Sequence, residues 1–321
     1  MKRLAWLAMA AVPAGALPAQ AQDDVEIYGR VNTSVESQRS GDAGRVVVLQ
    51  NNASRFGLRG REDLGGGLQA GFNLESGFDS TNGAQTAASL FNRQSELNLR
   101  GDFGTLRLGN WIPDSYFATA DDVSMHNHDT GTSADAFYGG PFPRTDKFGY
   151  VSPLLAGVQV WATLQTANAA PGDRRGVDLA ARYDQGPLHL GAGYSQQDRP
   201  DPLRAGALSD FSQFALRGRY VLPYLVFGGY YQRIDNGADG RRSVYRAAAM
   251  VPVGALEFHL NVGLASRTVT LPRAVQHTLA CNYNLSPRTK VYAFYTAQDA
   301  RHVVDRAGDF NALALGVRHN F

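Results

Sequence analysis

Several short segments of the chain alternate between apolar and polar residues with a period of two. In residues 25–32 the odd positions are mostly apolar and the even positions mostly polar. The same alternation recurs in residues 68–75, 105–108 and 313–318. A period of two places alternate side chains on opposite faces of a β-strand. These segments therefore predict strands with one apolar face and one polar face.

Two kinds of connection alternate between the predicted strands. Seven are tight and marked by Gly or Pro, at residues 63–67, 101–104, 152–153, 184–187, 222–223, 251–252 and 285–287. Eight are longer and polar, at residues 38–45, 78–89, 110–143, 166–176, 196–210, 235–242, 266–273 and 298–309. Fifteen connections join about sixteen antiparallel strands and place both chain ends on the side of the tight turns.

This asymmetry between the two ends predicts an all-β fold, a 16-stranded antiparallel transmembrane β-barrel with short periplasmic turns and long extracellular loops. Closing the sheet pairs every backbone group, which the apolar core of a bilayer requires. The apolar face then meets lipid, and the polar face lines a lumen wide enough to hold water. No Pro- or Ser-rich linker divides the chain, so we expect one barrel domain over residues 22–321.

Residues 1–21 have the pattern of a secretory signal. A positively charged start precedes an apolar run, and Ala19-Gln20-Ala21 has the small-x-small form that signal peptidase cuts. A buried N-terminal helix is the alternative interpretation. Export implies an oxidising compartment, but a single cysteine, Cys281, cannot form an internal disulfide.

Composition narrows the choice of protein class. The chain is 44% hydrophobic and 19% charged, which is too apolar for a disordered chain. No run of about 18 apolar residues is present to form a spanning helix. The formal net charge is only +2, so we expect no nucleic-acid partner. Only three of the 31 basic residues are lysines, which leaves 28 arginines.

A set of short motifs spreads over residues 23–321. They are Ser54–Gly60, Glu62–Leu68, Leu74–Phe78, Leu90–Gln94, Gly101–Gly109, Arg144–Lys147, Tyr150–Pro153, Tyr283–Thr289 and Gly316–Phe321. Together they resemble the general, non-specific porins of the Gram-negative outer membrane, of the β-proteobacterial and neisserial type. The resemblance is most specific in the N-terminal third of the chain.

The resemblance implies a homotrimer of barrels, each with its own water-filled pore and a third outer loop folded inward. It implies passive diffusion of small hydrophilic solutes and ions, with no cofactor and no catalysis. Outer-membrane lipid and lipopolysaccharide would surround the barrel. The terminal Phe321 matches the residue that the outer-membrane assembly machinery reads.

Arginines dominate the candidate pore residues. Strand parity places Arg30, Arg55 and Arg107 on the polar, lumen-facing side, and family position adds Arg93 and Arg144 to the same basic wall. A guanidinium stays charged at any relevant pH, which suits a fixed electrostatic filter. Arg93 is in phase with outward-facing leucines, so a bulge intervenes, Arg93 lies above the regular strand, or its assignment is wrong. A GC-rich genome would also favour arginine over lysine.

The predicted third outer loop is acidic. Residues 111–143 contain no Lys or Arg and five aspartates, namely Asp114, Asp121, Asp122, Asp129 and Asp135. If this loop narrows the pore, these carboxylates would face the arginine wall and create a transverse field, and the arginines would give a modest anion preference. They could instead face outward or cap turns. His126-Asn127-His128-Asp129 has the composition of a metal site, but a solvated loop is favoured and no metal is expected.

Other functions remain open at this level. A substrate-specific porin for phosphate or organic acids would have the same sequence features. An outer-membrane enzyme barrel would need a catalytic pair near the rim, and Ser266 and His277 lack a supporting motif. An adhesive barrel with a plugged pore is a further alternative.

The signal assignment predicts the mature N-terminus. Protein isolated from outer membranes should begin at Gln22 when its intact mass and N-terminal peptide are measured. The bulky substitution Ala21→Phe should leave the precursor uncut, because signal peptidase needs a small residue before the cleaved bond. A membrane-embedded protein that retains Met1 would contradict this assignment.

Overall fold

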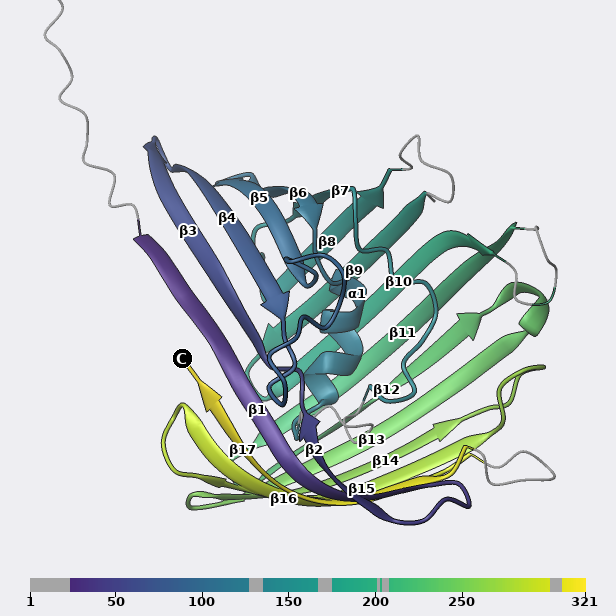
Figure 1. The fold of residues 1–321 in the computed structure, drawn as a ribbon. Helices are drawn as coiled ribbons and strands as arrows, with labels where there is room; N and C mark the ends of the chain where they lie inside the picture. Colours follow the sequence, from purple (N-terminus) through teal and green to yellow (C-terminus); the bar gives the residue numbers. More distant parts are fainter. Residues whose placement is uncertain (1–23, 127–134, 167–174, 201–202, 204–207, 301–307) are drawn as a thin grey trace, which may run out of the picture.

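In the computed structural model one antiparallel sheet curls into a closed barrel (Figure 1). The structure describes residues 24–126, 135–166, 175–200, 203, 208–300 and 308–321. The first half of the chain forms β1 (Asp24–Ser40), β2 (Val46–Asn51), β3 (Arg55–Gly65), β4 (Leu68–Gly77), β5 (Gln94–Gly101), β6 (Gly104–Asn110), α1 (Asp114–Tyr116), the π-helix η1 (Phe117–Asp121), β7 (Lys147–Val151) and β8 (Val158–Gln165). The second half forms β9 (Gly176–Gln185), β10 (Leu188–Pro200), β11 (Leu208–Leu222), β12 (Leu225–Asp235), η2 (Gly237–Asp239), β13 (Arg241–Val253), β14 (Leu256–Ala265), β15 (Ala274–Asn284), β16 (Thr289–Asp299) and β17 (Phe310–Asn320).

The barrel closes where the last strand returns to the first. β17 pairs with β1 from Arg30↔Asn320 to Ser40↔Phe310. The backbones of Gly29 and Phe321 then exchange two hydrogen bonds of 3.0 Å. β2 and β3 lie end to end beside β1, so the 17 strands of the described residues occupy sixteen positions around the barrel. The predicted sixteen-stranded barrel is confirmed.

The two faces of each strand have the predicted chemistry. On β1, Asn32, Ser34 and Glu36 are buried inside the barrel, whereas Val31 and Val35 are exposed on its outer surface. The same alternation runs through β14, where Phe258 points outward and His259 inward. Apolar side chains on the outside can meet lipid, and polar side chains on the inside meet the lumen.

The connections also follow the prediction, with long loops at one end and short turns at the other. The start of β1 and the C-terminus both lie at the end with the short turns (Figure 1). Two of the predicted connections differ from the structure in their bounds. β10 and β11 extend to Pro200 and from Leu208, into the predicted loop 196–210, and β13 continues through Pro252 to a turn at residues 254–255.

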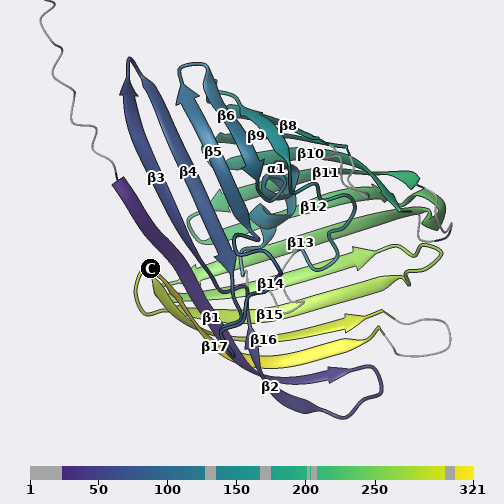
Figure 2. The same ribbon diagram turned by 45° about the horizontal axis from the view of Figure 1, so that its top comes forward.

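The long connection between β6 and β7 folds into the barrel instead of outward. Figure 2 shows α1 inside the ring of strands, and α1 and η1 contact β9, β10 and β11. Two glycines on β10 permit this approach. A Cβ atom on Gly191 would lie 1.9 Å from the Ala118 carbonyl oxygen, and one on Gly193 would lie 2.8 Å from the Ser115 Cβ. No helix in the described part of the chain combines the length and the apolar character that crossing a membrane requires.

The seat of the inner loop predicts the effect of one methyl group. Gly191→Ala should push η1 away from β10, lower the free energy of unfolding by about 1–3 kcal/mol and alter single-channel conductance. Urea unfolding in detergent micelles and planar-bilayer recordings measure the two effects. Gly218→Ala on β11 is the matched control, since its added Cβ meets nothing closer than 4.0 Å. Equal behaviour of the two variants would contradict this account.

Candidate functional site

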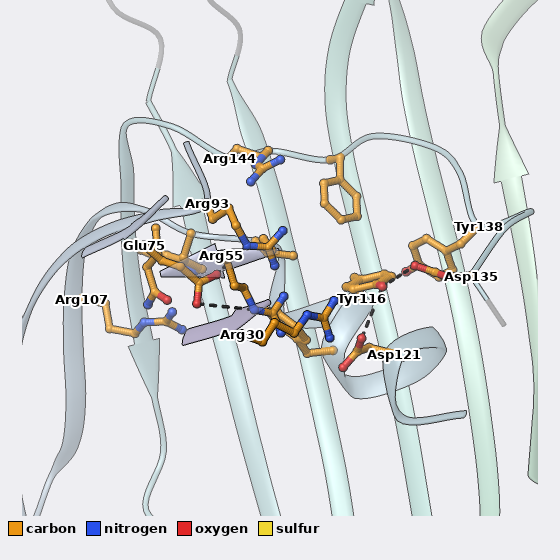
Figure 3. Close-up of a pocket in the computed structure, with 15 residues that line it drawn as sticks. Arg30, Arg55, Glu75, Arg93, Arg107, Tyr116, Asp121, Asp135, Tyr138 and Arg144 are labelled. Atoms are coloured by element: carbon orange, nitrogen blue, oxygen red, sulfur yellow. Dashed lines mark hydrogen bonds and ion pairs between the residues drawn. The ribbon is translucent and has the colours of Figure 1, made fainter. Parts of the chain in front are cut away.

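A cavity of about 520 Å³ lies in the lumen between the inner wall and the inserted loop (Figure 3). On the wall side it is lined by charged and polar residues, namely Arg30, Arg55, Glu75, Arg93, Gln94, Arg107 and Arg144. On the loop side it is lined by Trp111, Ile112, Tyr116, Phe117, Asp121, Asp135, Tyr138 and Phe142. All five arginines predicted for the basic wall therefore line one cavity.

Carboxylates hold three of these arginines in place. Glu75 accepts a hydrogen bond of 2.5 Å from Arg93 Nε, and its other oxygen lies 3.9 Å from Arg55 Nε. Arg107 pairs with Glu96 at 2.8 Å and with Asp114 at 2.9 Å. Such charge-assisted contacts fix the guanidinium planes more firmly than neutral hydrogen bonds would.

Backbone carbonyl oxygens position the other two arginines. Arg30 donates to the carbonyls of Ala53 and Asn52, at 2.9 and 3.3 Å. Arg144 donates to the Asn92 carbonyl at 2.9 Å. Burial, together with the nearby positive charge of Arg93, lowers the pKa of Arg144 from its usual value. A negative charge placed beside Arg144 and Arg93 would therefore be stabilised.

The structure settles how Arg93 reaches the lumen. β5 begins at Gln94, and the Arg93 amide donates to the Glu75 carbonyl at 3.1 Å from just outside the strand. The parity of the β5 leucines therefore does not apply to Arg93. The position of Arg93 just before β5 agrees with the alternative that places it above the regular strand.

The loop side of the cavity combines rings and carboxylates. The centroid of the Tyr116 ring lies 5.4–5.5 Å from the ring centroids of Phe117, Tyr138 and Phe142. Its hydroxyl donates to Asp135 at 2.5 Å and lies 3.4 Å from Asp121 (Figure 3). Asp121 and Asp135 thus line the cavity on the side opposite the arginines.

Of the other loop aspartates in the described residues, Asp114 also pairs with an arginine of the predicted wall, whereas Asp122 pairs with different arginines. Asp114 is buried against the base of the wall, where it pairs with Arg107 and accepts from the Trp111 indole at 3.2 Å. Asp122 faces away from the predicted wall because η1 turns its end towards β9 and β11. Asp129 lies outside the described residues.

Asp122 contacts a second group of arginines that the sequence analysis missed. It forms ion pairs with Arg217, with Arg219 at 3.3 Å and with Arg182 at 3.7 Å. Arg217 and Arg219 alternate with outward-facing Leu216 along β11, so strand parity could have identified them.

The prediction of a solvent-exposed loop was wrong for His126. Its imidazole is buried, and its ring centroid lies 5.2 Å from that of His259 and 5.6 Å from that of Phe294. Burial is the main cause that keeps the pKa of His126 well below its ordinary value, and the neighbouring side chains of His259 and Lys290 lower it further. The loop therefore crosses the lumen and packs against the opposite wall. His128 lies outside the described residues.

A buried polar network anchors α1 to the far wall. The Ser115 amide donates to Asp178 on β9 at 3.1 Å, and the Ser115 hydroxyl donates to the same carboxylate. Ser195 on β10 donates to Asp178 at 2.6 Å, and Gln213 on β11 donates to Ser195 at 3.1 Å. These contacts join three strands to the loop and determine how far it enters the lumen.

Comparison with known proteins identifies the family. A model of the Gram-negative porins matches residues 5–302. The chain belongs to the Gram-negative porin family. This porin is 29% identical to outer membrane porin protein 32 of Delftia acidovorans, over 97% of this chain and 98% of the relative. Over 31% of the chain it is 38% identical to the major outer membrane protein P.IB of Neisseria meningitidis serogroup A, covering 32% of that protein.

Solved structures agree with the sequence relatives. The anion-selective porin from Comamonas acidovorans superposes with a TM-score of 0.78 at 26% identity, over 94% of this chain and all of the other. Family membership makes the chain a channel protein of the Gram-negative outer membrane and not an enzyme. The predicted family, location and channel function are confirmed.

The anchor of the porin's inner loop predicts a stability effect. Asp178→Ala removes the shared acceptor of Ser115 and Ser195 and should lower the free energy of unfolding by about 1–3 kcal/mol. Asp178→Asn retains one acceptor oxygen and should cost less. Urea unfolding in micelles measures both, with the exposed residue Asp102, in the turn after β5, replaced by Ala as a control. An Ala variant as stable as the control would contradict the anchoring role.

Proposed function

We propose that Arg30, Arg55, Arg93, Arg107 and Arg144 form the basic wall of the pore constriction and give the channel a modest anion preference. The observation that carries this proposal is that all five line one lumenal cavity, opposite the inserted loop. The structurally similar porin from Comamonas acidovorans is anion-selective, which supports the same direction of preference.

The charges on the two sides of the cavity would act on solutes through a transverse field. Guanidinium groups lie on the wall, and the carboxylates of Asp121 and Asp135 lie on the loop. Such a field orients dipolar solutes and attracts anions to one side. Water and salt in the lumen screen it over about 10 Å at 0.1 M ionic strength, so selectivity is modest and passage remains diffusive.

We further propose that the mature protein is residues 22–321, assembled as a homotrimer among outer-membrane lipid and lipopolysaccharide. One solved outer membrane protein of similar fold, OmpT of Vibrio cholerae, is described in a trimer form. The assembly machinery would read Phe321, whose side chain is partly exposed at the barrel seam beside Gly29.

Substitution of the wall arginines tests the constriction. Arg55→Ser, Arg93→Ser and Arg144→Ser should each reduce the chloride-to-potassium permeability ratio. A unit charge about 4 Å from an ion in water contributes about 1 kcal/mol, which corresponds to roughly a fivefold change. Reversal potentials in a KCl gradient across a planar bilayer measure this ratio.

Arg241→Ser is the matched control for these variants. Arg241 is an exposed arginine at the start of β13, paired with Asp235 at 2.9 Å and outside the cavity. It should leave the reversal potential unchanged. Wild-type channels that prefer potassium would overturn the anion preference, and three unchanged variants would overturn the assigned wall.

A further inference from the structure

The cavity has an apolar component that a filter for inorganic ions does not require. Phe117 is 40% exposed although it lines a polar lumen, and Phe142 and Tyr138 are half-buried around it. Fixed charge and water are enough to select chloride over potassium. Aromatic rings at the same place favour a solute that carries an apolar surface.

The rings form one cluster with its centre at Tyr116. Phe142 and Tyr138 meet the Tyr116 ring edge-to-face, at interplanar angles of 68° and 73°, and Phe117 meets it at 59°. The Tyr116 hydroxyl is already engaged with Asp135. Ring faces and edges that remain on the cavity side can pack against another aromatic ring in offset or T-shaped geometry.

The opposite wall provides the complementary polar contacts. A guanidinium has five N–H donors in a planar fork that matches a carboxylate. Arg144 uses one of its nitrogens on the Asn92 carbonyl, and Arg93 uses its Nε on Glu75. The two guanidinium groups lie above Arg55 on the same side of the cavity, and Tyr116 lies across from them (Figure 3).

We infer that this cavity is a binding site for small aromatic carboxylates, with the carboxylate on the Arg93 and Arg144 side and the ring against Phe117 and Phe142. The inference rests on the proposed function, since it assigns a solute class to the same constriction. The cavity volume of about 520 Å³ falls in the range of roughly 300–1,000 Å³ typical of small-molecule sites. The channel would then be a porin with a preferred class of organic acid.

Benzoate is the probe, and cyclohexanecarboxylate and acetate are the matched anions. In single-channel recordings of the purified porin, benzoate should block the KCl current saturably and at lower concentration than either control anion. Cyclohexanecarboxylate has the same charge and nearly the same size, so a difference between the two acids reports the aromatic ring. This comparison needs no variant and does not depend on the folding of one.

Leucine substitutions locate the ring site. Phe117→Leu and Phe142→Leu should each weaken benzoate block by roughly twofold to tenfold, the range expected for loss of one aromatic pair. Phe103→Leu, in the turn after β5 and away from the cavity, should leave the block unchanged. Arg144→Ser should weaken block by benzoate and by both control anions alike.

The outcomes separate this inference from the proposed function. Equal block by benzoate and cyclohexanecarboxylate, or benzoate block that ignores both leucine variants, overturns the aromatic site even where chloride is preferred over potassium. A ring-dependent benzoate block in a channel without chloride preference keeps the aromatic site and overturns the proposed selectivity. The KCl reversal potential of the unsubstituted channel decides between these two results.

Discussion

The pairing of β17 with β1 is the contact on which the rest of the structure depends. An open sheet would leave two edges of unpaired N–H and C=O groups in hydrocarbon, and each such group costs several kcal/mol. The ladder from Arg30↔Asn320 onward, together with the Gly29–Phe321 hydrogen bonds, pairs both edges. Closure also separates the two faces of every strand, so apolar side chains meet lipid and polar side chains line the lumen.

A barrel of this width needs something other than an apolar core to narrow it. Here the β6–β7 connection crosses the lumen and is held by charged and polar contacts, from Arg107–Asp114 at its base to Ser115–Asp178 at the far wall. Gly191 and Gly193 on β10 have no side chain, so the backbone of the β6–β7 connection can approach this strand closely. Because the loop is fixed on both sides, the arginines and the aromatic rings face each other at a defined separation.

Much of the architecture could be predicted because it depends on local patterns. Strand alternation placed Arg30, Arg55 and Arg107 on the lumen side, and turn residues gave the number of strands. The errors arose where distant segments meet. Asp122 was assigned to the wrong wall, and His126 was expected in solvent although it is buried against β14 and β16. Strand alternation could not predict which way Arg93 points, because Arg93 precedes the first residue of β5.

The sequence alone determined that the chain forms a barrel, that long loops and short turns lie at its opposite ends, and which strand residues face the lumen. These properties follow from a period of two and from the chemistry of turns, which act over a few residues. Only the tertiary structure decided which side chains share the cavity, which carboxylate pairs with which arginine, and that Tyr116, Phe117 and Phe142 face the basic wall. Those relations depend on the path of one loop across the lumen, and that path is set by contacts with β9, β10 and β11 far along the chain.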